Sequence, residues 1–199
     1  MREIYLVTGV SSGIGFGVAE ILLQNGKTVI GVSRHENEKI GSLQKKFKDT
    51  FCFEPKDLSC DLDHLPKWVA QQSKKHGQFS GFVHAAGVTQ VLPNMYNNMQ
   101  KMLDVFGINL FAALQLTKGV ADRRNNRGKG TSIVLISSIA ATTGATGTVN
   151  YSASKASLLG AAKSLAKELA PLGVRVNTVL PGFVDTEMTR KTYSSSFFE

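Results

Sequence analysis

The chain contains 199 residues, of which 42% are hydrophobic and 19% charged, so it is long enough to bury a sizeable core and has an ordinary globular composition. No apolar run is long enough to cross a bilayer, and the first residues lead into a strand-like run without the apolar core of a signal peptide. The net charge of +8 is compatible with an anionic ligand, with an acidic protein partner, or with general solubility.

Short apolar strands alternate with helical patterns along almost the whole chain, which predicts βαβ units and a parallel sheet. In the first half we expect, in chain order, a strand at Glu3–Thr8, a helix at Ile14–Gln24, a strand at Thr28–Ser33, a helix at Glu36–Lys48, a strand at Thr50–Glu54 that Pro55 closes, and a helix at Asp63–Lys75. In the second half we expect a strand at Gly81–His84, an irregular stretch at Val88–Gln100, a long helix ending near Arg124, a strand at Ser132–Ser137, a helix at Asn150–Leu169 and a strand at Val174–Leu180. Right-handed crossovers and a chain reversal after the third strand would give a doubly wound sheet with helices on both faces, in one domain over residues 1–199.

The cysteines and histidines predict neither a disulfide framework nor a metal site. Only Cys52 and Cys60 are present, and neither belongs to a close Cys/His cluster in the sequence. The histidines His35, His64 and His76 show no ligand spacing. A reducing compartment, the cytoplasm, is the simplest expectation.

The basic stretch Arg123–Lys129 lies between a helix-like and a strand-like segment. It lacks the interleaved aromatic residues that a platform for single-stranded nucleic acid needs. We therefore expect it to be a solvated loop, and we expect neither a nucleic acid nor a membrane as a partner.

Three glycines, Gly9, Gly13 and Gly15, follow the first strand and open the first helix. Glycine lets the backbone approach a pyrophosphate closely, and a helix N-terminus supplies free N–H groups and the positive end of a dipole. The spacing is G-x-x-x-G-x-G, and it is not a P-loop because no Gly-Lys-Ser/Thr follows. Taken alone, the trio could also be a tight strand–helix turn that binds nothing.

Tyr151 and Lys155 are four residues apart, so they share one face of a helix. An ammonium group beside a phenol favours the phenolate and lowers its pKa from the ordinary value of about 10. This pair predicts a proton donor for carbonyl/alcohol redox chemistry, and the alternative is an exposed pair of helix residues.

Six motifs together resemble the short-chain dehydrogenase/reductase family, over essentially the whole chain. They occur in the family's order: Thr8–Gly15, His84–Gly87, Asn109, Ser138, Tyr151–Lys155 and Pro181–Gly182. The chain looks closest to the classical branch, and within it to 3-oxoacyl-[acyl-carrier-protein] reductases. The resemblance implies a Rossmann fold.

The resemblance also implies catalytic roles for four residues. Tyr151 would be the general acid in reduction, and Lys155 would lower its pKa and hydrogen-bond the nicotinamide ribose. Ser138 would hold the substrate carbonyl, and the thirteen-residue spacing to Tyr151 selects it over its neighbour Ser137. Asn109 would support a water-linked proton relay to Lys155, although it could instead be a residue on the helix surface.

The resemblance implies a nicotinamide dinucleotide as cofactor. Its contacts would be Gly9, Ser11, Ser12, Gly13, Ile14, Gly15, Ser33, Arg34, Asp57, Leu58, Ala86, Gly87, Tyr151, Lys155, Pro181, Gly182, Val184 and Thr186. A site that prefers NAD usually places an acid at the end of the second strand, whereas this chain has Ser33 and Arg34 there. NADP(H) is therefore favoured over NAD(H) because a guanidinium can pair with a 2′-phosphate. Arg34 could also be simply solvated, and Ser12 stands where family members of this type often carry a basic residue.

The chain departs from the family pattern in two places. His-Ala-Ala-Gly at His84–Gly87 stands where the family usually has Asn-Asn-Ala-Gly, and we interpret His84 as a structural histidine. The sequence also ends soon after Pro181–Met188, at Ser194–Glu199, which predicts a sheet without the usual seventh strand. The sixth strand would then be an apolar edge, which either a partner chain covers or a shortened form leaves open.

The resemblance implies a homodimer or homotetramer, formed by the helix that begins near Asn150 and the helix that contains Asn109. The many small residues after Asn150 permit close helix packing, which could equally be on the chain's own sheet. The expected substrate is a carbonyl compound, free or bound to a carrier protein, with a 3-oxoacyl thioester as first choice. Another ketone, a sugar or a steroid-like alcohol is a further candidate, as is a nucleotide-binding regulator without turnover.

Overall fold

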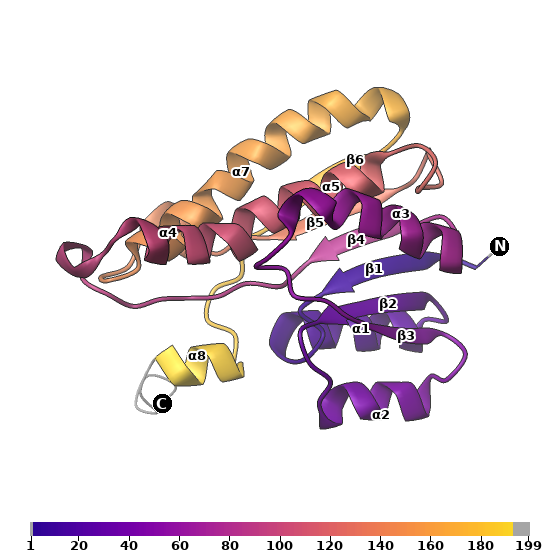
Figure 1. Ribbon diagram of the computed structural model, residues 1–199, viewed down its shortest axis with the longest axis horizontal. Coiled ribbons are helices and arrows are strands. Elements are labelled where there is room, and N and C mark those ends of the chain that lie inside the picture. Colours follow the sequence, from indigo (N-terminus) through magenta and orange to yellow (C-terminus); the bar gives the residue numbers. More distant parts are fainter. Residues whose placement is uncertain (1, 193–199) are drawn as a thin grey trace.

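The structure is a computed structural model that describes residues 2–192, in which six parallel strands lie between two layers of helices (Figure 1). The strands are β1(Ile4–Thr8), β2(Thr28–Ser33), β3(Phe51–Pro55), β4(Gly81–His84), β5(Ser132–Ile136) and β6(Arg175–Val179). The α-helices are α1(Gly13–Gln24), α2(Glu38–Lys46), α3(Leu65–His76), α4(Met99–Phe106), α5(Ala112–Ala121), α6(Ala140–Thr143), α7(Val149–Leu169) and α8(Glu187–Thr192). Short 3₁₀ turns are η1(Leu62–His64), η2(Asn94–Tyr96) and η4(Ala170–Leu172), and η3(Gly107–Phe111) is a π-helical turn.

The sheet has the predicted doubly wound topology, with strand order β3-β2-β1-β4-β5-β6. β1 pairs with β2 on one side and with β4 on the other, so the chain reverses direction across the sheet after β3. Within residues 2–192 the sheet has no seventh strand, as predicted, and the stretch Ser194–Glu199 lies outside the described residues. The reversal opens a crevice at the carboxyl ends of β1 and β4, where doubly wound folds bind their ligands.

Each face of the sheet has its own apolar core, because successive side chains of a strand point to opposite faces. On one face, Leu6 and Phe82 pack with Leu116 of α5 and Leu158 of α7. On the other face, strand residues such as Val7 and Val29 pack with the buried residues of α1 and α2. Figure 1 shows the same division, with α1 and α2 on one side of the sheet and α3, α5 and α7 on the other.

The predicted long helix is confirmed as one unbroken helical run over residues 99–121, in which the π-helical turn η3 joins α4 to α5. It ends at Ala121, a little before the predicted end near Arg124. α4 begins inside the stretch predicted to be irregular, where the side chain of Asn98 accepts a hydrogen bond from the backbone N–H of Lys101 at 2.9 Å. The π-helical turn cannot be read from a 3.6-residue periodicity, since it adds a residue to one turn only. It is the turn that carries Asn109.

The other predicted strands and helices are confirmed in type, with ends that differ by one or two residues. Pro55 is the last residue of β3 and does not stand outside it. A proline is tolerated there because β3 is the edge of the sheet. The short helix α8, which follows the Pro181-Gly182 turn, was not predicted.

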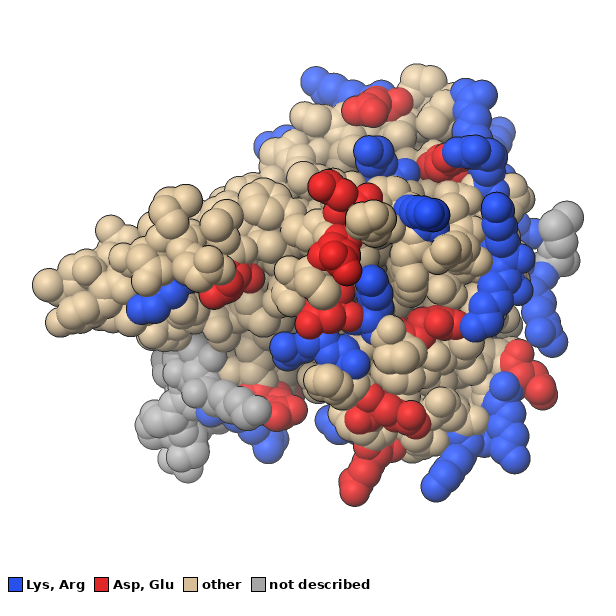
Figure 2. Space-filling view, viewed as in Figure 1, with Lys and Arg blue, Asp and Glu red and all other residues tan. Residues whose placement is uncertain are grey.

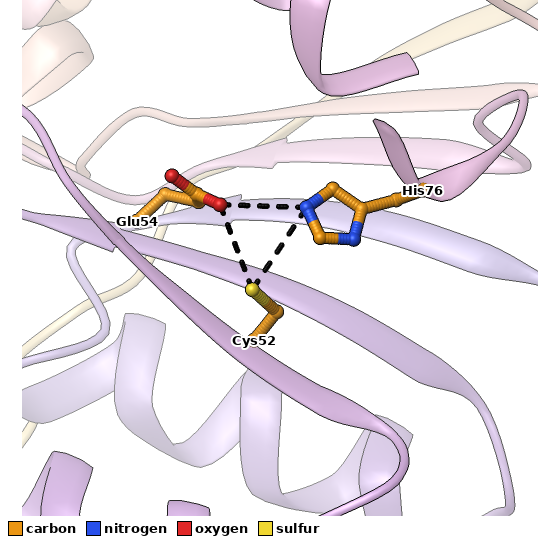
Figure 3. A group of neighbouring side chains, drawn as sticks. All are labelled: Cys52, Glu54 and His76. Carbon is orange, nitrogen blue, oxygen red and sulfur yellow. Dashed lines mark hydrogen bonds and ion pairs between the residues drawn. The ribbon is translucent and has the colours of Figure 1, made fainter. Parts of the chain in front are cut away.

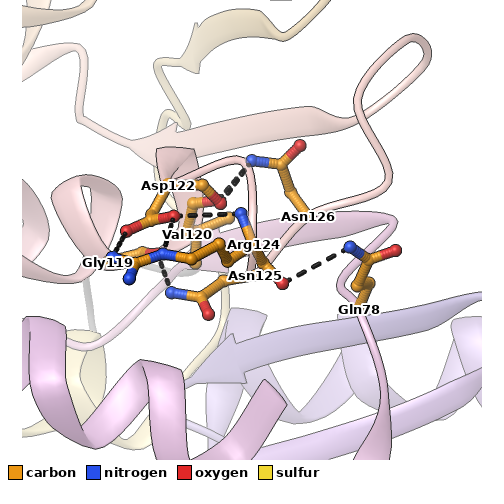
Figure 4. Close-up of polar contacts among 7 residues, drawn as sticks. All are labelled: Gln78, Gly119, Val120, Asp122, Arg124, Asn125 and Asn126. Carbon is orange, nitrogen blue, oxygen red and sulfur yellow. Dashed lines mark hydrogen bonds and ion pairs between the residues drawn. The ribbon is translucent and has the colours of Figure 1, made fainter. Parts of the chain in front are cut away.

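The basic stretch Arg123–Lys129 is only partly the solvated loop that we predicted (Figure 4). Asn125 and Asn126 are buried, and their side-chain amides each donate to a backbone carbonyl in the last turn of α5 at 2.8 Å. These bonds satisfy carbonyls that a helix end leaves without partners. Arg124 is exposed and pairs with Asp122 at 2.6 Å, and its hydrogen bonds lower the pKa of that carboxyl to about 2.

The charges are unevenly spread over the face shown in Figure 2. Lysine and arginine side chains gather toward the amino ends of the strands, whereas the protruding end near α4 shows few charges. That end exposes Met95, Tyr96, Met99 and Leu103. Among the described helices none is long and apolar enough to cross a membrane.

Candidate active site

The turn between β1 and α1 favours glycine at three positions, at two for the backbone conformation and at one for lack of space. Gly9 and Gly13 have positive φ angles of 77° and 54°. A Cβ on Gly15 would lie 2.3 Å from the carbonyl oxygen of Gly9, so no larger residue fits there. Ser12, the N-cap residue of α1, makes no side-chain hydrogen bond to the helix, which leaves the first-turn N–H groups available to an anion.

The glycine turn packs directly on the loop after β4. A Cβ on Gly9 would lie 2.8 Å from the backbone nitrogen of Ala86. The hydroxyl of Thr8, which is fully buried, accepts hydrogen bonds from the N–H groups of Ala85 and Ala86 at 3.2 and 3.1 Å. The same hydroxyl donates to Nδ1 of His84 at 3.1 Å. Thr8 and His84 therefore supply hydrogen bonds in the place where the family usually has asparagines.

His84 is a structural histidine, as predicted. It is fully buried, and its Nε2–H donates to the carbonyl of Ile108 at 3.1 Å while Nδ1 accepts from Thr8. Burial, and secondarily the positive charge of Lys155, lower the pKa of His84 to about 3. The imidazole therefore stays neutral at physiological pH and has no free nitrogen for acid–base chemistry.

Asn109 is fully buried in the π-helical turn and is not the helix-surface residue of the alternative reading. Its amide donates to the carbonyl of Val88 at 3.0 Å and to the hydroxyl of Ser154 at 2.9 Å, while its oxygen accepts from the N–H of Val88 at 2.8 Å. A Cβ on Gly87 would lie 3.1 Å from Oδ1 of Asn109 and 3.3 Å from Nζ of Lys155. Asn109 thus fixes the loop after β4 to α7, next to Lys155.

The two neighbouring serines at the end of β5 have different surroundings. The hydroxyl of Ser137 is buried and donates to the backbone carbonyl of Lys155 at 2.8 Å, so it holds α7 to the sheet. Ser138 is half-buried and lines both cavities described below, and its oxygen accepts from the N–H of Ala140 at 3.1 Å. Its hydroxyl proton can therefore still be donated to a ligand.

Tyr151 and Lys155 lie one turn apart on α7, and both face the main cavity. Nζ of Lys155 lies 5.9 Å from the centre of the Tyr151 ring and donates to the carbonyl of Ile136 at 2.7 Å. Lys155 is only 4% exposed, and this burial lowers its pKa to about 8. The side chain therefore remains an ammonium at neutral pH.

The main cavity, of about 240 Å³, runs along the carboxyl ends of the strands and gathers nearly all the predicted site residues. Two of them do not line it: Gly15, whose backbone supports the glycine turn, and Asn109, which lies behind Gly87. The predicted residues that do line it are Gly9, Ser11, Ser12, Gly13, Ile14, Ser33, Arg34, Asp57, Leu58, Ala86, Gly87, Ser138, Tyr151, Lys155, Pro181, Gly182, Val184 and Thr186.

One end of this cavity lies between β2 and β3 and combines two cations with one acid. Arg34 is exposed and Lys56 half-buried, and both line the cavity. The carboxylate of Asp57 accepts from the N–H and hydroxyl of Ser59 at 2.8 and 2.7 Å, and these bonds, with a smaller effect of Arg34, lower its pKa. This end can hold an anionic group.

Several residues that line the cavity were not predicted, among them Lys56, Ile108, Met188 and Thr189. Lys56 directly precedes Asp57, so its place at the end of a strand was a usable signal. Met188 and Thr189 lie on α8, which was not predicted. They also line a second cavity of about 170 Å³, which shares Ser138, Tyr151 and Gly182 with the first.

The residues present fit a nicotinamide dinucleotide. The glycine turn leaves no room for side chains beside the helix N-terminus, which suits a pyrophosphate. The cavity then continues from this turn toward Arg34 at one end and toward Tyr151 and Lys155 at the other. A ligand with an anionic middle and two larger ends matches that layout.

Comparisons with known proteins show which family this chain resembles. The chain matches the family model of the short chain dehydrogenases over residues 3–196. It is 34% identical over 191 residues to a 3-oxoacyl-[acyl-carrier-protein] reductase of Salmonella typhimurium, a match that covers 94% of this chain and 76% of that protein.

Solved structures give the same result. A 4-hydroxyisoleucine dehydrogenase complexed with NADH is similar with a TM-score of 0.87 and 25% identity, covering 98% of this chain and 79% of that one. An actinorhodin polyketide ketoreductase variant with NADPH is similar with a TM-score of 0.86 and 31% identity, covering 98% and 77%. The chain spans as little as 65% of another similar structure. From the family match and the relatives together, the chain belongs to the short-chain dehydrogenase family of oxidoreductases.

Proposed function

We propose that this chain is an NADP(H)-dependent reductase that converts a 3-oxoacyl thioester to the 3-hydroxyacyl form. The observation that carries the proposal is the one cavity that the glycine turn, Ser138, Tyr151 and Lys155 all line. The similarity to a 3-oxoacyl-[acyl-carrier-protein] reductase supports the substrate class.

In the proposed reaction, a nicotinamide held beside Tyr151 and Lys155 would supply the hydride for the carbonyl carbon. Tyr151 gives its phenolic proton to the carbonyl oxygen as negative charge develops there. The ammonium of Lys155, 5.9 Å from the ring centre, favours the phenolate that remains. Ser138 donates its hydroxyl proton to the same carbonyl oxygen and orients the substrate.

Asn109 acts in this proposal as a positioning residue. Asn109 makes three hydrogen bonds, two to Val88 and one to Ser154. It therefore holds the loop after β4, whose Gly87 lies between Asn109 and Lys155. A water beside Gly87 could then connect Lys155 to solvent and restore the proton that Tyr151 gives away.

The cofactor preference rests on the charges at the β2–β3 end of the cavity. Arg34 and Lys56 both line it, and Ser33 stands where an acid would repel a 2′-phosphate. Two cations near a phosphate favour NADP(H) over NAD(H). The negative charge of Asp57 would repel a 2′-phosphate, but Oδ1 of Asp57 already accepts two hydrogen bonds from Ser59.

The second cavity suits an acyl chain. It adjoins the first at Ser138 and Tyr151, and its lining includes Ile139, Phe183 and Met188. A β-ketoacyl group placed there would bring its carbonyl to the hydroxyls of Ser138 and Tyr151. A thioester carrier would lie outside the cavity.

The test follows NADPH absorbance with an acetoacetyl thioester, for the wild type and for Tyr151→Phe. We expect the variant to lose about 10²- to 10⁴-fold in kcat, the usual contribution of a general acid, with an NADPH affinity close to that of the wild type. Tyr96→Phe, which changes an exposed tyrosine, is the matched control and should keep full activity.

Three outcomes contradict the proposal in different ways. If wild type and Tyr151→Phe consume NADPH at the same rate, Tyr151 is not the proton donor. If the wild type binds NADPH but reduces no 3-oxoacyl thioester, while a free ketone or sugar is turned over, the substrate class is wrong. Binding without turnover of any carbonyl compound supports a nucleotide-binding regulator.

We also propose that the chain forms a homodimer or homotetramer. The support is the exposed apolar surface near α4, where Met95, Tyr96 and Met99 are 81%, 60% and 67% exposed. Large exposed apolar patches are typical of sites where proteins bind one another. Sedimentation of the wild type and of Met99→Glu should show an oligomer that the substitution weakens, and a monomeric wild type contradicts this proposal.

A further inference from the structure

A cluster of three potential metal ligands lies outside the cavity, on the edge strand of the sheet. Cys52 and Glu54 are on β3, and His76 is the last residue of α3 (Figure 3). The prediction that neither cysteine belongs to a Cys/His cluster is therefore wrong for Cys52, which the fold places beside His76. Cys52 and His76 are 24 residues apart, so only the fold brings them together.

The alternation of β3 explains why the two strand residues meet His76. Phe51 and Phe53 pack in the core beneath α1 and α2. Cys52 and Glu54 therefore point to the opposite face, where α3 lies. The side chains of His76 and Glu54 are 17% and 16% exposed, so the cluster is largely sheltered but open to small solutes.

The three ligand atoms converge on one point. Sγ of Cys52 lies 3.8 Å from Nε2 of His76 and 3.6 Å from Oε1 of Glu54, and these nitrogen and oxygen atoms are 3.4 Å apart. A tetrahedral Zn²⁺ with ordinary bond lengths separates S from N by about 3.6 Å, S from O by about 3.5 Å and N from O by about 3.3 Å. The observed triangle is already close to the size that one zinc ion requires.

We propose that Cys52, Glu54 and His76 form a binding site for a divalent metal ion of the zinc class, with water as the fourth ligand. Thiolate, imidazole and carboxylate are the ligand types that zinc prefers, whereas Mg²⁺ and Ca²⁺ select oxygen ligands. The ion would link the edge strand β3 to the end of α3. Asp57 and Leu58, which line the cavity, follow β3 within three residues.

The geometry argues against a cysteine nucleophile activated by a histidine. In such a triad the thiol and the acid contact different ring nitrogens, because the acid orients the base through the nitrogen that does not take the proton. Here Cys52 and Glu54 both approach Nε2 of His76. Convergence on one nitrogen is the arrangement of ligands around a single ion.

Lys75 competes with the metal for Glu54. Its ammonium lies 2.7 Å from Oε1 of Glu54, the same atom that faces Cys52 and His76. The Lys75 side chain is 61% exposed, so it can turn into solvent when an ion binds. Removing this ammonium should therefore strengthen metal binding, whereas removing any of the three ligands should weaken it.

The experiment titrates the reduced, metal-free full chain with Co²⁺ and, separately, with Zn²⁺, and measures affinity and stoichiometry. We expect one ion per chain, a thiolate-to-cobalt charge-transfer absorption, and a higher melting temperature with Zn²⁺ but not with Mg²⁺. Cys52→Ser and His76→Ala should each weaken binding by at least about tenfold, since even a residue that only orients a ligand contributes that much. Lys75→Gln should bind more tightly than the wild type.

Matched controls separate this site from general surface binding. Cys60→Ser and His64→Ala change an exposed cysteine and an exposed histidine outside the cluster, and both should bind like the wild type. The proposal is overturned if Cys52→Ser binds Zn²⁺ as tightly as the wild type, or if the cobalt complex shows no charge-transfer absorption. It is equally overturned if Cys60→Ser loses binding and Cys52→Ser does not. None of these readouts depends on enzymatic turnover, so they also stand apart from the proposed reductase activity.

Discussion

Backbone atoms shape the glycine-turn end of the cavity, whereas buried polar side chains shape the end that contains Tyr151. At the first end the critical contacts are between Gly9, Gly15 and the loop after β4, where a Cβ would meet main-chain atoms. At the second end, Asn109, Ser154 and Lys155 are each 4% exposed or less. Asn109 donates a hydrogen bond to Ser154, and Lys155 donates one to the carbonyl of Ile136. We therefore expect the residues needed for function to lower the stability of the folded chain at the Tyr151 end but not at the glycine-turn end.

At the glycine-turn end, the backbone shape that favours an anion does not lower the stability of the folded chain, since no charged side chain is buried in the turn. At the Tyr151 end, one side chain is held in a costly environment, because Lys155 carries its charge in a nearly closed site. A hydrogen bond to the carbonyl of Ile136 compensates only part of that cost. The predictions below separate these two situations.

The largest expected effect is the pH dependence of stability caused by Lys155. Its pKa is about 8 in the folded protein, below the ordinary value of 10.5, so the unfolded chain binds more protons between these values. The cost of the buried charge is fully present below pH 8 and is relieved as the pH rises toward 10.5, by as much as about 3 kcal/mol at about 1.4 kcal/mol per pKa unit. Lys155→Met lacks this dependence.

Denaturant unfolding of both proteins across that pH range measures it. The stability of the wild type relative to Lys155→Met should rise with pH, because groups that lie away from Lys155 titrate alike in the two chains. If the free energy of unfolding changes with pH in the same way in both proteins, Lys155 is not buried as an ammonium. The proposed difference between the two ends of the cavity would then be wrong.

The paired serines give the next effect and sharpen the contrast within one end. Ser138→Ala should lower kcat/KM for a 3-oxoacyl thioester by about 10²-fold, the lower range for losing a donor to a developing oxyanion, with little change in stability. Ser137→Ala should instead cost about 1 kcal/mol of stability, because a buried hydrogen bond to the carbonyl of Lys155 is lost. Steady-state kinetics and denaturant unfolding of both variants test this division, and equal effects on kcat/KM would refute it.

The outcome at the site shows what a sequence can and cannot predict there. The glycine turn and the Tyr151–Lys155 pair were readable because their residues are close in the chain and their geometry follows from local structure. The cluster of Cys52, Glu54 and His76 was not readable, since it depends on where the end of α3 meets β3. Local motifs report local geometry, and contacts between distant elements require the fold.

The fold shows the same limit. The alternation of strands and helices and the reversal after β3 followed from apolar patterns and were confirmed. The π-helical turn at Gly107–Phe111 inside the long helix was missed, because the hydrogen bonds of Asn109 to Val88 and Ser154 stabilise a turn that has no periodic signature. The burial of Asn125 and Asn126 was missed for a related reason, since a polar sequence does not reveal that its amides cap α5.

A smaller effect tests the glycine-turn end directly. Gly15→Ala places a Cβ 2.3 Å from the oxygen of Gly9, and the resulting strain should cost about 1–3 kcal/mol of stability and weaken dinucleotide binding. Gly17→Ala is the matched control on the same helix, where a Cβ meets nothing within 4 Å, and it should raise stability by up to about 1 kcal/mol. Thermal unfolding and NADPH titration measure both effects. Equal stability and equal NADPH affinity of the two variants would mean that the backbone at Gly9 and Gly15 can move apart to admit a Cβ.

The smallest expected effect concerns Arg34, whose exposed guanidinium lines the cavity beside Lys56. Arg34→Ala should weaken NADPH binding by about tenfold, roughly 1.4 kcal/mol, because one charge-assisted contact to the 2′-phosphate is lost in a partly screened position. NADH binding should stay unchanged, and Arg123→Ala, an exposed arginine in the loop after α5, should leave both affinities unaltered. Calorimetric titrations of the three proteins with both cofactors test this. If the wild type binds NADPH and NADH equally, the cations at this end do not select the cofactor, and the cavity then recognises the dinucleotide through its backbone turn alone.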